Sequence, residues 1–288
     1  FCNMINFKRT IIIILAIFYK TSCISFHSLS REIIINENQW TDKNFIFSDV
    51  SKELFKQKKI NENWSSFESD KRIPYFKLKN SRGKILGDHI KNNEKFLVIN
   101  LENNKKYKWK YNHAKKNLLP SHIAVFEDVE NAKKLIGKYI WLNNIVSDTI
   151  FMGQLGSSFK KFQKVNVIGV KIYQNSIVDC PIWLEIDLKN DFNSYIRYNG
   201  KFKIHSRQNN YFIKNPIKKS WDQTSIEKIM EGKIEYGMNH EQVRASIGNP
   251  DIINNTSSRH GVSEQWIYGK NLSNKRYLIF ENGRLSSM

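Results

Sequence analysis

Few residues of this chain have the types and spacing that chemistry requires, and two carboxylates come first. Glu185 and Asp187 are two residues apart in an apolar run, so a strand would place both on one face. Two acids on one face can hydrolyse a glycosidic bond, one as general acid and the other as nucleophile or base. This spacing is common in ordinary strands, and the sequence contains no Gly-rich phosphate loop, Gly-x-Ser-x-Gly elbow or His-Glu-x-x-His helix. We therefore expect no enzyme activity and no catalytic residue.

The thiols and imidazoles form no recognisable metal or nucleophile site. Cys180 precedes Pro181 in an apolar run, which favours a buried, inert thiol over a nucleophile. The histidines are scattered without the spacing of zinc ligands, at His27, His89, His113, His122, His205, His240 and His260. We expect neither a metal ion nor another cofactor.

Aromatic and basic residues alternate through Lys106–Tyr111. In a strand, Tyr107, Trp109 and Tyr111 would share one face and the lysines would occupy the other. Aromatic rings beside lysines can stack on bases or sugars, but the aromatic face of a strand is more often part of the core. We expect the aromatic side chains in the core and the lysines in solvent, with no nucleic-acid partner.

The balance of charge is strongly basic. The chain carries 46 Lys and Arg against 27 Asp and Glu, a formal net charge of +19. This excess favours an anionic partner, namely lipid head groups, an envelope polymer or an acidic protein face. Because the basic residues are spread along a sequence that is also rich in Asn and Ile, a solvated charged surface is an equally good explanation. The sequence leaves both open.

The N-terminal residues 1–23 resemble a signal segment for export. Lys8 and Arg9 precede the apolar run Thr10–Tyr19, which is too short for a membrane-spanning helix of about twenty residues. Cys23 follows a small residue, as a lipoprotein cysteine does, although Lys20 stands where an apolar residue is usual. We predict that Cys23 is lipidated and anchors an outer-membrane lipoprotein that faces the periplasm. The alternative is an ordinary signal that is cut nearby, for example after Ser25, and a secreted chain.

The middle of the chain divides into two predicted parts. Residues 24–93 are polar and are predicted to form a linker or N-terminal extension, with a short helix over Ser51–Lys59. Residues 94–218 are predicted to form a β-rich domain, a small barrel or sandwich, with one helix over Glu127–Lys134. Its expected strands are Phe96–Leu101, Lys106–Tyr111, Ile136–Leu142, Val165–Tyr173, Ile182–Leu188, Tyr195–Tyr198 and Lys201–Ile204.

Residues 219–288 are predicted to form an independent α+β module. Asn239 is a good N-cap, and Gln242 lies three residues on, where a capping box needs it. Gly248 is suited to a left-handed C-cap, and Pro250 stops the helix. The expected helices and the three expected antiparallel strands are Thr224–Met230, Glu241–Ile247, Ile252–Thr256, Glu264–Tyr268 and Lys275–Phe280.

This C-terminal quarter resembles the SmpA/OmlA, or BamE-like, lipoprotein family. That family's pattern runs Gly-Met-(Thr/Ser)-x-Glu-Gln-Val, then Gly-x-Pro, Trp-x-Tyr and (Asn/Asp)-Gly. The matching residues are Gly237, Met238, Glu241, Gln242, Val243, Gly248, Pro250, Trp266, Tyr268, Asn282 and Gly283. The resemblance implies a helix-helix-sheet fold at the bacterial envelope, and none of the matching residues carries over as a binding residue.

Two functions from different classes follow. The first is a non-enzymatic envelope lipoprotein that binds or scaffolds at the periplasmic face of a membrane, in outer-membrane assembly or maintenance. Its partners would be the membrane, through the lipid anchor, and a protein, an anionic lipid or an envelope polymer. The alternative is an exported hydrolase or hydrolase inhibitor whose functional face lies in the β-rich middle.

The lipid anchor can be tested directly on Cys23. Cells fed a fatty-acid analogue should label the wild-type chain and should not label the Cys23→Ala variant, because the thiol is the predicted site of acylation. Cys180→Ala leaves that thiol in place and should label like the wild type. Equal labelling of Cys23→Ala and the wild type would contradict the anchor.

Overall fold

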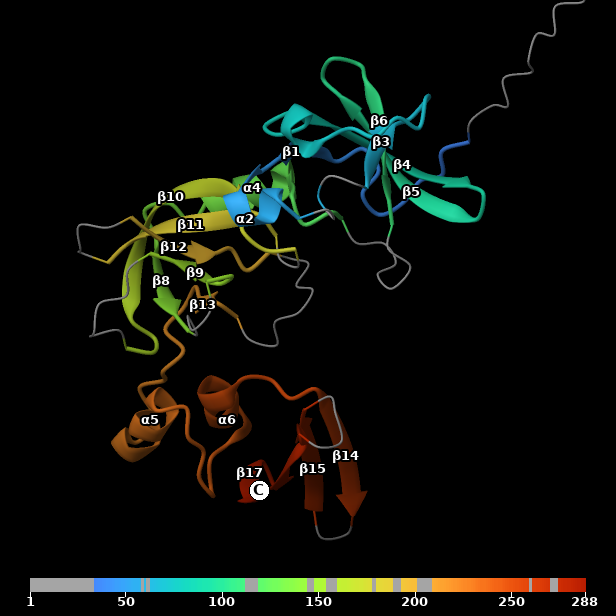
Figure 1. The fold of residues 1–288 in the computed structure, drawn as a ribbon. Helices are drawn as coiled ribbons and strands as arrows, with labels where there is room; N and C mark the ends of the chain where they lie inside the picture. The colour runs from blue at the N-terminus through green and yellow to red at the C-terminus, as the bar shows by residue number, and fades with distance from the viewer. Residues whose placement is uncertain are drawn as a thin grey trace, which may run out of the picture.

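The computed structural model describes most of the chain from residue 34 onward. The described residues are 34–57, 60, 63–111, 119–143, 148–153, 160–177, 180–188, 193–200, 209–258, 261–269 and 274–288. The fold is mixed and β-rich, with sheets that curl like half-barrels and a few helices. Three sheets follow one another along the chain (Figure 1).

The first sheet has the strand order β3-β6-β5-β4-β1-β7, and every pairing in it is antiparallel. The expected strands Phe96–Leu101 and Lys106–Tyr111 are confirmed as a hairpin, because β5 and β6 are hydrogen-bonded neighbours. The strands of this sheet are β1 (Asn44–Phe47), β3 (Trp64–Ser66), β4 (Arg82–Lys91), β5 (Glu94–Leu101), β6 (Lys106–Lys110) and β7 (Ile123–Val125).

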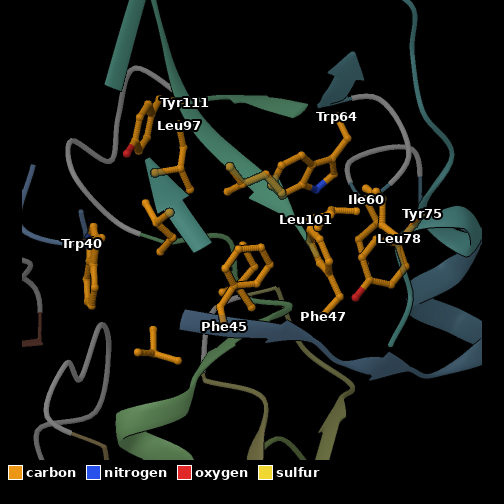
Figure 2. Close-up of a cluster of buried hydrophobic side chains, with 14 of the residues drawn as sticks. Trp40, Phe45, Phe47, Ile60, Trp64, Tyr75, Leu78, Leu97, Leu101 and Tyr111 are labelled. Carbon is orange, nitrogen blue, oxygen red and sulfur yellow. The ribbon is translucent and has the colours of Figure 1, made fainter. Parts of the chain in front are cut away.

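The prediction of a polar linker over residues 24–93 is wrong for the part that the structure describes. These residues supply four strands, β1 to β4, together with the short helix α2 (Lys52–Phe55) and the 3-10 turn η1 (Tyr75–Lys77). Phe45, Phe47 and Trp64 are fully buried, and Figure 2 shows their side chains gathered in one cluster. The linker prediction failed because these apolar residues are separated by polar ones, and their strand partners lie far along the chain.

The aromatic stripe on β6 is placed as expected, but one of its lysines is not. Tyr107 and Trp109 pack against the core of the first sheet. Lys108 is only 2 % exposed and lies beneath the turn that follows β3, where its ammonium donates to the carbonyl of Phe67 and pairs with Asp70. Hydrogen bonds from Lys108 and Lys91 lower the pKa of the Asp70 carboxyl. The expectation that the lysines of this strand are in solvent is therefore wrong for Lys108, the central one.

The second sheet has the order β13-β8-β10-β11-β12-β9, and β2 (Asp49–Val50) pairs in parallel with the end of β10. Helix α4 (Phe126–Lys133) packs Val129 and Ala132 into its core. The expected strand Lys201–Ile204 lies outside the described residues, whereas the other expected strands and the helix are found. The remaining strands are β8 (Tyr139–Leu142), β9 (Phe151–Met152), β10 (Lys164–Gln174), β11 (Ile182–Asp187), β12 (Ser194–Arg197) and β13 (Tyr211–Phe212).

The C-terminal part contains helices α5 (Gln223–Met230) and α6 (His240–Ile247), followed by four antiparallel strands. The capping box of Asn239 and Gln242 is present, and Gly248 has a φ of 89°. The prediction of three strands is one short, because the turn at Asn282 and Gly283 leads into a fourth. The strands are β14 (Ile252–Ser258), β15 (Gly261–Tyr268), β16 (Arg276–Glu281) and β17 (Arg284–Ser287).

None of the helices in the part of the chain that the structure describes is long and apolar enough to cross a membrane.

The core of the first sheet contains an imidazole that burial keeps neutral. Trp64 Nε1 donates to His122 Nε2 at 2.8 Å, and the His122 ring lies 4.9 Å from that of Tyr75. Burial lowers the pKa of His122 to about 3. In the unfolded chain the pKa returns to about 6.5. The unfolded state therefore binds the extra proton between pH 6.5 and pH 3.

Acid should consequently destabilise the fold through His122. The free energy of unfolding should fall as the pH drops from 6.5 towards 3, with a contribution from His122 of up to ~1.4 kcal/mol per pH unit. His122→Gln keeps an acceptor for Trp64 but cannot titrate, so its free energy of unfolding should depend less steeply on pH. Urea unfolding at several pH values measures both slopes. Identical slopes in the two proteins would contradict a buried, neutral imidazole.

Candidate functional site

The residues that the sequence singled out for chemistry do not come together in the structure. Cys23 lies outside the described residues. Glu185 is half-buried and accepts from the Tyr195 hydroxyl at 3.4 Å, and Asp187 is exposed further along the same strand. Cys180 is half-buried, and its thiol donates to the carbonyl of Tyr198 at 3.5 Å. None of these side chains lines the groove described below.

The histidines among the described residues lie apart. His89 contacts Phe67, His122 lies against Trp64, and His240 stacks on Trp266 with ring centroids 5.0 Å apart. Within the described ranges, no group of three or more His, Cys, Asp or Glu could hold a metal ion.

Two residues of the loop before β10, Lys161 and Phe162, extend from the second sheet into the C-terminal helices. We call this pair the Lys-Phe plug. The Lys161 ammonium donates to carbonyls at the ends of both helices, those of Ile229 at 3.3 Å, Ala245 at 2.9 Å and Ser246 at 2.5 Å. Carbonyls in the last turn of a helix have no partner within the helix and carry partial negative charge. One cation therefore satisfies the C-terminal ends of α5 and α6 together.

Burial of the amine is the cost of this arrangement. It lowers the pKa of Lys161 to about 8. A lysine that is partly removed from water is destabilised unless its donors find acceptors. The three carbonyls supply those acceptors, so the stability of this contact depends on both helix ends staying in place.

Phe162 is the apolar half of the plug. It is 7 % exposed and belongs to the same core cluster as Trp266 and Leu278 of the C-terminal sheet. Its ring meets that of Phe212 edge to face, with centroids 5.6 Å apart. The backbone of Phe162 has a φ of 61°, a conformation that a bulky residue adopts only where the surroundings enforce it.

The C-terminal residues therefore do not form the independent unit that the sequence predicts. Their core continues into the second sheet through the plug and through Trp141 and Phe212. The boundary at residue 219 marks a change in sequence pattern, whereas the packing extends across it.

An open groove of about 800 Å³ lies beside α6. Its wall on one side is α6 itself, which the plug holds by its last turn. The other wall comes from residues at the end of α4, after β8 and β12, and in the segment that links β13 to α5. Its apolar lining comes from Leu135, Tyr198, Phe212, Ile213, Trp221 and Ala245.

Charged side chains also line the groove, and cations outnumber acids. Lys214, Lys218 and Arg244 are the cations, and Glu241 is the acid, which gives a local charge of +2 from three positive charges and one negative. Lys218 pairs with Glu241 at 2.6 Å, and the Arg244 guanidinium lies 4.3 Å over the Trp266 ring. The Lys218–Glu241 pair is more than half exposed and contributes little to stability.

Asparagine side chains shape the wall opposite α6. Asn199 Nδ2 donates to the carbonyl of Tyr211 at 2.9 Å, and Asn199 Oδ1 accepts from the amide of Asn210 at 2.8 Å. Asn143 Nδ2 donates to the carbonyl of Asn209 at 2.8 Å. These amides bind backbone groups, so their role at this wall is to fix its shape.

Sequence reasoning missed this groove because its lining comes from five separate parts of the chain. They are Asn131–Leu135, Asn143, Tyr198–Gly200, Asn209–Trp221 and Glu241–Asn249. No local motif marks them. The only signal was the mixture of apolar and basic residues in the linker from Phe212 to Trp221, which the predicted domain boundary cuts in two.

No protein-family model, no curated protein and no solved structure matches this chain. The resemblance to the SmpA/OmlA family therefore stays a prediction from the residues quoted above.

The plug can be tested by removing its charge. Lys161→Met should lower the free energy of unfolding by ~1–3 kcal/mol, because the carbonyls of Ala245 and Ser246 lose a charged donor, whereas that of Ile229 still accepts from the Gly232 amide. Lys160 is the matched control, since it is the neighbouring residue and is exposed. Lys160→Met should change the free energy of unfolding by no more than ~0.5 kcal/mol. Urea unfolding measures both variants, and equal effects would contradict the plug.

Proposed function

We propose that this chain is a non-enzymatic binding protein whose groove beside α6 takes an anionic amphiphile. One observation carries the proposal: a largely apolar lining is combined with three cations and a single acid. The apolar lining would cover a hydrocarbon portion, and the basic side chains would bind a phosphate or carboxylate. Nothing in this arrangement requires a reaction.

The size of the groove favours a lipid-sized ligand over a protein face. Sites for small ligands are concave, mostly apolar and about 300–1,000 Å³ in volume, with a few polar groups that fix orientation. The groove of about 800 Å³ falls in that range. Protein partners more often meet a broad and flatter surface. An anionic phospholipid is therefore the ligand that we propose.

The sequence suggests where such a ligand would be met. A lipidated Cys23 would anchor the chain at the periplasmic face of the outer membrane, with the groove close to lipid. The resemblance to SmpA/OmlA lipoproteins supports the same location and a role in envelope assembly or maintenance. We propose both the lipid anchor and the location at the envelope.

The enzymatic alternative has less support from the geometry. The Glu185 carboxylate accepts from Tyr195 and lies across Gly169, where an added Cβ would be 2.7 Å from Glu185 Oε2. These contacts are typical of a surface carboxylate that packs against its neighbours. Turnover of a glycan by the purified protein, lost in Glu185→Gln, would overturn the non-enzymatic proposal.

Lipid binding can be tested with short-chain lipids that stay monomeric. Dihexanoyl phosphatidylglycerol should bind more tightly than dihexanoyl phosphatidylcholine, because only the first carries a net negative charge. Its affinity should fall when salt is raised from 0.1 M, since exposed charges are screened beyond ~10 Å at ~0.1 M salt. Isothermal titration calorimetry measures each affinity.

A charge reversal locates the binding. Lys214→Glu should weaken phosphatidylglycerol binding about fivefold, which corresponds to ~1 kcal/mol. Lys219 is exposed and lies five residues away outside the groove lining, so Lys219→Glu is the matched control and should bind like the wild type. Equal affinity for the two lipids, or equal effects of the two variants, would contradict the proposed ligand.

A further inference from the structure

Strand β14 is an unusually long edge in this fold. The edge strands of the first two sheets, β3, β7, β13 and β9, are only two or three residues long, and β17 has four. Short edges are one means by which proteins avoid pairing with other chains. β14 has seven residues and pairs with β15 along its whole length, so its other side is a long edge.

The side chains of β14 are exposed on both faces of the sheet. Residues 252 to 256 are all exposed, although a strand covered on one face would show alternation. Ile252 is 48 % exposed and Ile253 is 42 % exposed, and they point to opposite faces. On the neighbouring strand, by contrast, Trp266 is fully buried in one cluster with Ile229 of α5 and Val243 of α6.

The register shows which backbone groups face outward. The amide of Asn282 donates to the carbonyl of Val262, which places the hydrogen-bonding groups of even-numbered β15 residues towards β16. The odd-numbered residues of β15 therefore bind β14, where Gln265 faces Asn254. On β14, it follows that the amides and carbonyls of Ile253 and Asn255 point away from the sheet. Among the described residues, neither has a backbone partner on that side.

The usual chemical protection of an edge is also missing. Lysine, arginine or proline on an edge strand prevents further pairing. The sequence Ile-Ile-Asn-Asn-Thr-Ser-Ser contains none of them, although the chain has 46 Lys and Arg. The absence of charge is therefore a local property of β14 in a basic chain.

A second copy of the chain does not fit this edge well. The antiparallel self-pairing that overlaps all seven residues of β14 is centred on Asn255, and it would set Ile253 opposite Ser257 and Ile252 opposite Ser258. Both isoleucines would then face hydroxyl residues. A segment with apolar residues beside the isoleucines and hydrogen-bonding side chains beside Asn254, Asn255 and Thr256 would match the strand better.

We propose that β14 docks an extended segment of a partner polypeptide, which adds to the C-terminal sheet as a fifth strand. Main-chain hydrogen bonds to Ile253 and Asn255 give the affinity, and the apolar and polar halves of β14 set the register. This inference does not rest on the groove, whose lining contains no residue of β14 and which takes a ligand of different chemistry.

A peptide with the sequence of β15, Gly261–Tyr268, is a suitable probe, because it carries the side-chain pattern that β14 already pairs with. Added to the intact protein, it should slow hydrogen exchange of the Ile253 and Asn255 amides at least tenfold, as seen by NMR. The same peptide with alternate backbone amides methylated keeps its side chains and loses its donors. It should give no protection.

Two variants separate the backbone from the side chain. Asn255→Ala keeps the outward amide and should bind the peptide like the wild type. Asn255→Pro removes that amide, at an edge position that proline tolerates, and should abolish binding. Unchanged exchange of the β15 and β16 amides shows that the sheet of this variant is intact.

Three results would each overturn the proposal. They are protection by the methylated peptide, binding that survives Asn255→Pro in an intact sheet, and no protection by the parent peptide. Self-association of the chain that Asn255→Pro abolishes would overturn the assignment of a different partner. Lys214→Glu should leave peptide binding unchanged, so a failure of the lipid proposal is distinguishable from a failure of this one.

Discussion

The contact on which this structure depends most is that between the Lys161 ammonium and the carbonyls at the ends of α5 and α6. Two short helices that end close together concentrate partial negative charge in one place. A single cation from another part of the chain satisfies both. Phe162 follows directly and adds an aromatic ring to the core of the C-terminal sheet. Polar and apolar anchoring are therefore supplied by adjacent residues.

This constraint accounts for the groove. The last turn of α6 contains Ala245, which lines the groove and also accepts from Lys161. The last turn of α6 therefore both forms a wall of the groove and accepts hydrogen bonds from the Lys-Phe plug. The first sheet has its own core around Trp64 and His122, and that core shares no residue with the cluster around Phe162. The site belongs to the second sheet and the C-terminal module together.

Elements with a local signal could be predicted from the sequence. Asn239 with Gln242 marks the start of α6, and the apolar run from Val165 to Tyr173 marks β10, because capping and hydrophobic patterning act over a few residues. Phe45 was missed, since its strand is recognised only through partners near Gly83 and Val125. Lys108 was expected in solvent and the contacts of Lys161 were not predicted, because nothing nearby in the sequence shows what covers these lysines. The groove escaped prediction for the same reason.

The central claim is that Lys161 holds both helices and so fixes the groove wall. Hydrogen exchange of the backbone amides, compared between the wild type and Lys161→Met under native conditions, tests it most directly. The account predicts faster exchange in α5, in α6 and along the linker from Phe212 to Trp221, with unchanged exchange in β4 and β5 of the first sheet. Unchanged exchange in α5 and α6, or faster exchange spread equally over all three sheets, would contradict it.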